Sequence, residues 1–140
     1  MGFFNREIRI GDKMIGDTYP TYFIAEIGAN FDGNIEKAKR LIDAAKEAGA
    51  DCAKFQTFST SRIVSEGGFS HMQLKGVHGS WGRTVSDVFK DAEFPIAWHK
   101  EIADYCKAVS IDFSTSPYFK EAVDLCADLD VPFIKIGSGD

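Results

Sequence analysis

The spacing of apolar and polar residues along this chain predicts strands and helices in alternation. Residues 21–29 form a mostly continuous apolar run, which is typical of a strand buried on both faces. Residues 35–49 instead place their apolar side chains at helical spacing, with Asn34 as a candidate N-cap and Gly49 as the expected end. Similar runs predict three further strands, at residues 51–56, 111–116 and 132–140.

The segments before and after the third of these strands carry helical periodicity. Pro95 suits the first turn of one helix, and Pro117 is expected to open another. Residues 84–91 are predicted to form a shorter helix. The expected core positions of the two longer helices are Ile96, His99, Ile102, Ala103, Cys106 and Val109 in the first, and Phe119, Ala122, Val123, Cys126 and Leu129 in the second.

Two segments do not follow this alternation. Residues 6–16 alternate charged and apolar side chains around Gly11 and Asp12, which predicts a short β-hairpin on the surface. Residues 57–83 contain many glycine and serine residues with little periodicity, so a long loop is expected there. A mobile lid over a substrate and a disordered insertion both fit that composition, and we favour the lid.

The order of elements predicts an α/β fold with a parallel sheet and right-handed crossovers. A doubly wound sheet often starts with a G-x-G-x-x-G turn, which this sequence lacks. A complete (β/α)8 TIM barrel needs about 250 residues, whereas this chain has 140 and stops directly after a predicted strand. We therefore expect the N-terminal half of such a barrel, roughly four βα units at residues 21–140, preceded by a hairpin extension at residues 1–20.

Composition and charge narrow the class of ligand. A net charge of −5 and a pI near 5.2 argue against a non-specific nucleic-acid binder, which would present a basic face. No apolar run reaches the ~18 residues of a membrane span, and the first residues lack the apolar core of a signal peptide. We expect a cytoplasmic protein that binds small molecules, with reduced core thiols at Cys52, Cys106 and Cys126.

Polar residues occupy the carboxyl ends of all four buried strands, where parallel α/β proteins place their active sites. Because side chains alternate across a strand, Lys54 and Gln56 share one face, opposite Ala53 and Phe55. The candidate site residues are Glu26 on the first strand, Lys54 and Gln56 on the second, Ser114, Thr115 and Ser116 on the third, and Lys135, Ser138 and Asp140 on the fourth.

Lys54 is the most informative of these residues, because an ammonium group inside an apolar strand is costly unless a partner offsets its charge. Lys54 and Lys135 come from the second and fourth strands, whose inward side chains share a layer in a barrel. With Ser116, Ser138 and the glycine-rich backbone at residues 137–139, they predict a cradle for a phosphate or carboxylate.

A purely structural interpretation of the same residues is that Glu26 and Lys54 form a buried ion pair that only maintains the fold. We favour the binding function, since a buried ion pair is a weak source of stability. The histidines His71, His78 and His99 lack the spacing of a metal site, so no metal ligand is predicted among them.

The stretch "FIAEIGANFDGNIEKAKRLIDAAKEAGADCAKFQTF" and the terminal "VPFIKIGSGD" closely resemble the N-terminal part of the sialic acid (N-acetylneuraminate) synthase family. The combination of A-E-I-G-x-N, K-x-Q-T and K-I-G-S-G-[DE] at these distances carries the resemblance. It implies a transferase that condenses phosphoenolpyruvate with an N-acylated amino sugar, such as N-acetylmannosamine, and releases phosphate. It also implies a divalent metal, Mn or Mg, and a homodimer in the full-length form.

The resemblance assigns roles to the residues that match these motifs. They are Lys54, Ser116, Lys135 and Ser138 for holding phosphoenolpyruvate, Gln56 for contacting the sugar, and Glu26 and Asp140 beside the reacting centre. Phe31 stands where the family usually has histidine, which puts a proton-transfer role at that position in doubt. The family's metal-binding histidines belong to later strands, so the metal ligands are expected outside this chain.

Two other functions stay open at this point. One is a related phosphoenolpyruvate-dependent synthase of the octulosonate phosphate or heptulosonate phosphate type, which an arginine-rich phosphate site would favour. The other is a non-catalytic half-barrel that keeps only the anion cradle. The 140 residues alone are expected to be inactive, because half a barrel leaves strand edges unpaired and its interior uncovered.

Overall fold

The computed structural model describes residues 6–70 and 82–137, which form an α/β fold. Its centre is a three-stranded parallel sheet in the order β3-β4-β5. The strands are β3 (Ile24–Gly28), β4 (Cys52–Thr57) and β5 (Asp112–Pro117). Each strand is followed by a helix that packs back on the sheet, as the sequence pattern predicts: α1 (Ile35–Glu47), α5 (His99–Ala108) and α6 (Lys120–Asp128).

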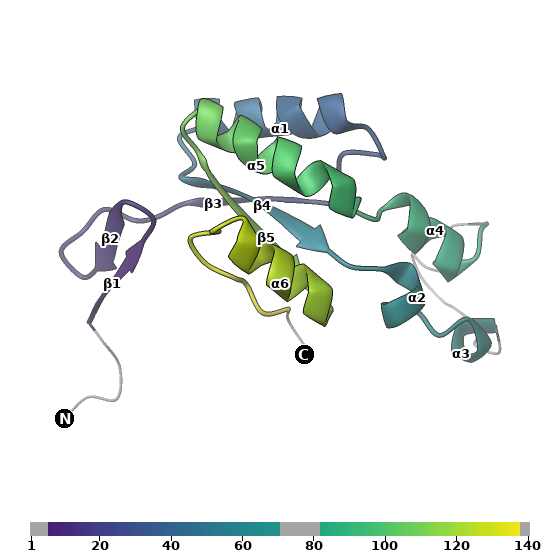
Figure 1. Ribbon diagram of the computed structural model, residues 1–140. Coiled ribbons are helices and arrows are strands. Elements are labelled where there is room, and N and C mark those ends of the chain that lie inside the picture. The colour runs from purple at the N-terminus through teal and green to yellow at the C-terminus, as the bar shows by residue number, and fades with distance from the viewer. Residues whose placement is uncertain (1–5, 71–81, 138–140) are drawn as a thin grey trace.

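Helices α1 and α5 run side by side over one face of the sheet (Figure 1). Between them and the strands lies a core built largely of aromatic rings. Phe55 of β4 stacks on Phe94 with ring centroids 4.7 Å apart, and Phe31 contacts both rings. Phe31 has no solvent exposure and is a core residue.

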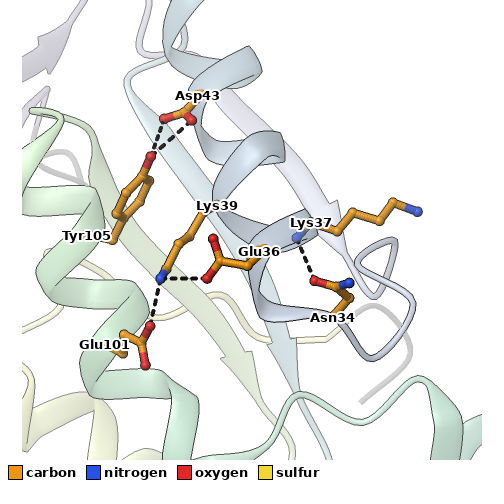
Figure 2. A network of polar contacts seen from close by, with 7 residues as sticks. All are labelled: Asn34, Glu36, Lys37, Lys39, Asp43, Glu101 and Tyr105. Atoms are coloured by element: carbon orange, nitrogen blue, oxygen red, sulfur yellow. Dashed lines mark hydrogen bonds and ion pairs between the residues drawn. The ribbon is translucent and has the colours of Figure 1, made fainter.

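Helix α1 begins and ends where the sequence predicts. The Asn34 side chain accepts a hydrogen bond from the backbone N–H of Lys37, which satisfies one of the free donors of the first turn. Gly49 follows the helix with a φ of +84°, a conformation that favours glycine. Figure 2 shows this cap beside the contacts that join α1 to α5: Lys39 bridges Glu36 and Glu101, and the Tyr105 hydroxyl donates to Asp43.

The segment between β4 and α5 contains more structure than the predicted long loop. It includes the short helices α2 (Thr60–Ile63) and α3 (Glu66–Ser70), the predicted helix α4 (Val85–Asp91) and the 3-10 turn η2 (Ile96–Trp98). Residues 71–81 of the predicted loop lie outside the described part, so the lid hypothesis for this loop stays a prediction. None of the helices in residues 6–70 and 82–137 has the length and apolar character needed to cross a membrane.

The N-terminal residues form two antiparallel strands, β1 (Glu7–Ile10) and β2 (Lys13–Gly16), joined at Gly11 and Asp12. They lie near the end of the sheet at which its strands begin (Figure 1). Lys13 forms an ion pair with Asp51, and a Cβ on Gly11 would lie 3.2 Å from Oδ2 of Asp112. The pair of strands therefore docks at the end opposite the candidate site.

Three details of the expected fold are wrong. Pro117 is the last residue of β5 and does not open α6, because the fixed φ of proline fits either place and its missing N–H is tolerated at a strand end. Ile96 and Val123 were expected in the core but are 49% and 42% exposed. Residues 132–137 make a single parallel bridge, Thr115 to Ile134, in place of a continuous strand, since Pro132 lacks an N–H and this segment lies at the sheet edge.

Removing the helix cap tests the origin of α1. We expect Asn34→Ala to lower the free energy of unfolding by about 1 kcal/mol, because the Lys37 N–H loses its acceptor. Asn34→Asp keeps a side-chain acceptor and should stay close to the wild type. Urea denaturation followed by tryptophan fluorescence measures both variants; equal stability of Asn34→Ala and the wild type would contradict the assignment.

Candidate functional site

The register of the sheet brings the predicted polar residues to two adjacent levels of one face. Glu26 of β3 pairs with Lys54 of β4, and Lys54 pairs with Ser114 of β5. Two residues further along, Gln56 pairs with Ser116. Paired residues of a parallel sheet point to the same face, so these side chains lie on the face opposite Phe55 and the helices. Strand alternation thus predicted their common face correctly.

The partner of the Lys54 ammonium is the carboxylate of Glu26, with which it forms an ion pair. The two side chains differ in environment, because that of Lys54 is 6% exposed and that of Glu26 is 51% exposed. The lysine of this pair is therefore buried in the sheet, and the glutamate is accessible to solvent. A ligand can therefore approach the pair from the side of Glu26.

Gly28 shapes the space above this pair. The register shifts between Glu26 and Gly28, which is a β-bulge, and Gly28 has a φ of +57°. A Cβ at Gly28 would lie 3.4 Å from Oε1 of Glu26 and 3.8 Å from Nε2 of Gln56. The Glu26 carboxylate and the Gln56 amide therefore both lie next to the backbone at the end of β3.

The edge segment carries the second predicted lysine. The backbone N–H of Lys135 donates to the Thr115 carbonyl at an N–O distance of 3.4 Å, and Ser114 Oγ donates to the Phe133 carbonyl at 2.8 Å. The bridge between Ile134 and Thr115 brings the backbone of Lys135 beside β5. The last two candidates, Ser138 and Asp140, lie outside the described residues.

A buried polar network lies directly behind the site, on the helix side of the sheet. His99 Nε2 is 2.6 Å from Thr57 Oγ1, and Thr57 Oγ1 is 2.8 Å from Thr115 Oγ1. His99 Nδ1 is 3.0 Å from the Pro95 carbonyl oxygen. All three side chains are buried, and burial lowers the pKa of His99 from its ordinary value of 6.5. Helical periodicity predicted a core position for His99 but gave no sign of its bond to Thr57.

The described residues do not supply a metal site. No group of three or more His, Cys, Asp or Glu side chains in residues 6–70 and 82–137 is placed to hold an ion. The cysteines are buried free thiols, and burial raises the pKa of both Cys52 and Cys106 to about 12. The chemistry that these residues offer is the binding of an anion by lysine and of hydroxyl groups by Glu26 and Gln56.

Comparison with known proteins identifies relatives of this chain. A sequence profile described as the NeuB family matches residues 41–140. N-acetylneuraminate-9-phosphate synthase of Mus musculus is 39% identical over 132 residues, covering 91% of this chain and 35% of that protein. N,N'-diacetyllegionaminic acid synthase of Legionella pneumophila is 30% identical over 136 residues, covering 97% of this chain and 38% of that protein.

A solved structure also matches. The sialic acid synthetase of Leptospira borgpetersenii, crystallised in complex with citrate, superposes with a TM-score of 0.76 at 25% identity. The match covers 93% of this chain and 40% of that one. This chain therefore spans between 35% and 40% of the length of these three proteins.

Removing each member of the ion pair separates its stabilising role from a binding role. We expect Lys54→Met to keep or raise the free energy of unfolding, because it removes a buried charge. Glu26→Gln should lower it by about 1–2 kcal/mol, since the Lys54 ammonium stays buried without its carboxylate. Lys37→Met, which breaks a more exposed ion pair with Asp32, should change it by less than about 0.5 kcal/mol. Denaturation by urea measures all three, and a large loss for Lys54→Met would favour the purely structural interpretation.

The buried imidazole predicts a dependence of stability on pH. Since the folded pKa of His99 lies below its unfolded value, the unfolded chain binds the proton more tightly. The contribution of neutral His99 is complete above about pH 6.5 and is lost as the pH falls through its folded pKa. Subtracting the stability of His99→Gln from that of the wild type between about pH 7.5 and about pH 5 isolates this effect. A difference that does not shrink toward acid would contradict it.

Proposed function

Because the chain belongs to the NeuB family, we propose that the protein to which it belongs is a nonulosonate synthase of the sialic acid type. It condenses phosphoenolpyruvate with an N-acylated amino sugar such as N-acetylmannosamine and releases phosphate. The observation that carries this proposal is the buried Lys54 ammonium, held by Glu26 on one face of a parallel sheet. Family membership supports the class of enzyme, and the polar face supports an anionic substrate.

We also propose that residues 21–140 are the first half of a (β/α)8 barrel and residues 1–20 an extension. The two edges of the sheet support this arrangement. Near the β3 edge, Phe23 and Ile24 are 61% and 45% exposed, and at the other edge Ile134 and Ile136 are 43% and 75% exposed. Further strands pairing at both edges would bury these side chains and would close the face of Lys54 into the mouth of a barrel.

The proposed reaction divides the work between the lysines and the polar groups beside them. Lys54 and Lys135, with Ser116 and Ser138, offset the charge of phosphoenolpyruvate and orient it. Carbon 3 of the enol phosphate then forms a bond to the aldehyde carbon of the sugar, whose oxygen takes up a proton. Positive charge develops at carbon 2, where water adds and loses a proton, and the hemiketal phosphate releases inorganic phosphate to leave a ketone.

Glu26 and Gln56 act on the sugar side of this scheme. The exposed Glu26 carboxylate is placed to bind a sugar hydroxyl or to accept the proton of the added water, and Gln56 binds the sugar beside it. Asp140 is assigned to the same centre. The proposal for the whole protein includes a divalent Mn or Mg ion whose ligands lie outside residues 1–140.

Replacing either lysine tests the proposal. In the whole protein, we expect Lys54→Met and Lys135→Met to lower kcat/KM for phosphate release by at least about a hundredfold, because each removes a charge that positions the donor. Phosphate release from phosphoenolpyruvate and N-acetylmannosamine measures the rate, with the product identified by mass spectrometry. Lys107→Met, on the exposed side of α5, is the control and should keep the wild-type rate. Full activity of either site variant would refute the assignment.

A further inference from the structure

The carboxyl end of β4 is held by more than its ladder of backbone hydrogen bonds. β4 leaves the sheet after Thr57, and the chain runs through short helices before it returns as α5. His99 is the first residue of α5, and it reaches back to Thr57. The first turn of α5 is thereby fastened to the last residue of β4, although the two residues are 42 positions apart.

The donors and acceptors of this network have a single consistent order. Imidazole in its neutral form has one donor and one acceptor nitrogen. The Pro95 carbonyl only accepts, so Nδ1 of His99 carries the hydrogen and Nε2 is the acceptor. Thr57 therefore donates to His99, and Thr115 donates to Thr57. The low pKa of the buried His99 keeps the ring in this neutral form.

Among the described contacts of the His99 ring there is no charged side chain. The ring packs on Phe94, with centroids 4.3 Å apart, and meets Phe113 edge-on. Its polar contacts include the Thr57 hydroxyl, the Pro95 carbonyl and the backbone of Ile96. The orientation of the ring is thus fixed on both sides by apolar packing and at both nitrogens by hydrogen bonds.

The network bears on the site because its members alternate with site residues along the strands. Thr57 follows Gln56, and Thr115 precedes Ser116. Gln56 and Ser116 are themselves paired in register and point to the opposite face. A displacement of Thr57 or Thr115 on the helix side is therefore transmitted through one peptide bond to a residue assigned to the substrate.

We propose that His99 is a positioning residue, which holds Gln56 and Ser116 in place for substrate through the hydroxyl groups of Thr57 and Thr115. The inference rests on the proposed function, because it gives Gln56 and Ser116 their substrate. It goes beyond that function by assigning a role to three buried side chains that touch no substrate. The network lies on the helix-covered side of the sheet, and it affects the positions of Gln56 and Ser116 on the other side.

Paired substitutions at Thr57 in the whole protein test this inference. Thr57→Val keeps the shape and removes the hydroxyl, and we expect kcat/KM to fall by about tenfold to a hundredfold as KM rises for both substrates. Thr57→Ser keeps the hydroxyl and should restore most of the wild-type kcat/KM. Tyr105→Phe is the matched control, since it also removes a hydroxyl that joins α5 to a neighbouring element and lies away from the strand ends (Figure 2).

The outcomes separate positioning from general stabilisation. A loss of kcat/KM in Thr57→Val but not in Tyr105→Phe, at similar losses of thermal stability, supports the inference. An active wild type whose Thr57→Val variant keeps its kcat/KM overturns it and leaves the proposed function intact. A wild type inactive on phosphoenolpyruvate and N-acylated amino sugars overturns both.

If Thr57→Val does not fold, a second pair of variants and one measurement on the wild type test the inference. The amide of His99→Gln reaches the position of Nε2 and accepts from Thr57, whereas that of His99→Asn reaches only toward Pro95. We expect His99→Gln to keep the higher kcat/KM, and the reverse order overturns the inference. Nitrogen-15 NMR of the wild-type imidazole should show the hydrogen on Nδ1, and a hydrogen on Nε2 overturns the proposed order of donors.

Discussion

The fold depends on offsetting the charge of Lys54 inside the sheet. An ammonium group that is almost fully buried needs a counter-charge at its own level, and the parallel register supplies one because Glu26 is the residue paired with it on β3. The Glu26 side chain keeps about half of its surface in solvent. The ion pair therefore satisfies the lysine without closing the face on which it lies, and the same contact serves the stability of the sheet and, under the proposed function, the binding of an anion.

The two faces of the sheet carry different kinds of side chain. Because side chains alternate along each strand, every residue of one face is bonded through the backbone to residues of the other. On β4, Phe55 belongs to the aromatic core and Thr57 to the network of His99, while Lys54 and Gln56 face the site. Every site residue on this strand thus has a core residue as its neighbour. Under the positioning role proposed for His99, the helix-covered side holds the neighbouring site residues in place through the backbone.

Local signals in the sequence were sufficient for much of this structure, and contacts between distant parts of the chain were not predicted. The Asn34 cap and the alternation around Lys54 depend on neighbouring residues, so the sequence predicted α1 and the common face of Lys54 and Gln56. Periodicity shows which side of a helix is apolar but not whether another element covers it, which explains the exposed Val123. The bond between Thr57 and His99 joins residues far apart in the chain, so no local pattern indicates it.

The bulge at Gly28 explains why β3 contributes one acidic side chain to the site and then leaves it. A regular strand would place residue 28 on the face of Glu26 and beneath Gln56, where a side chain would fill the space between them. Glycine adds no side chain, and its positive φ turns the backbone away into the segment that leads to α1. The Glu26 carboxylate and the Gln56 amide can then share the end of β3, so one glycine keeps the space between these two side chains free of a third side chain.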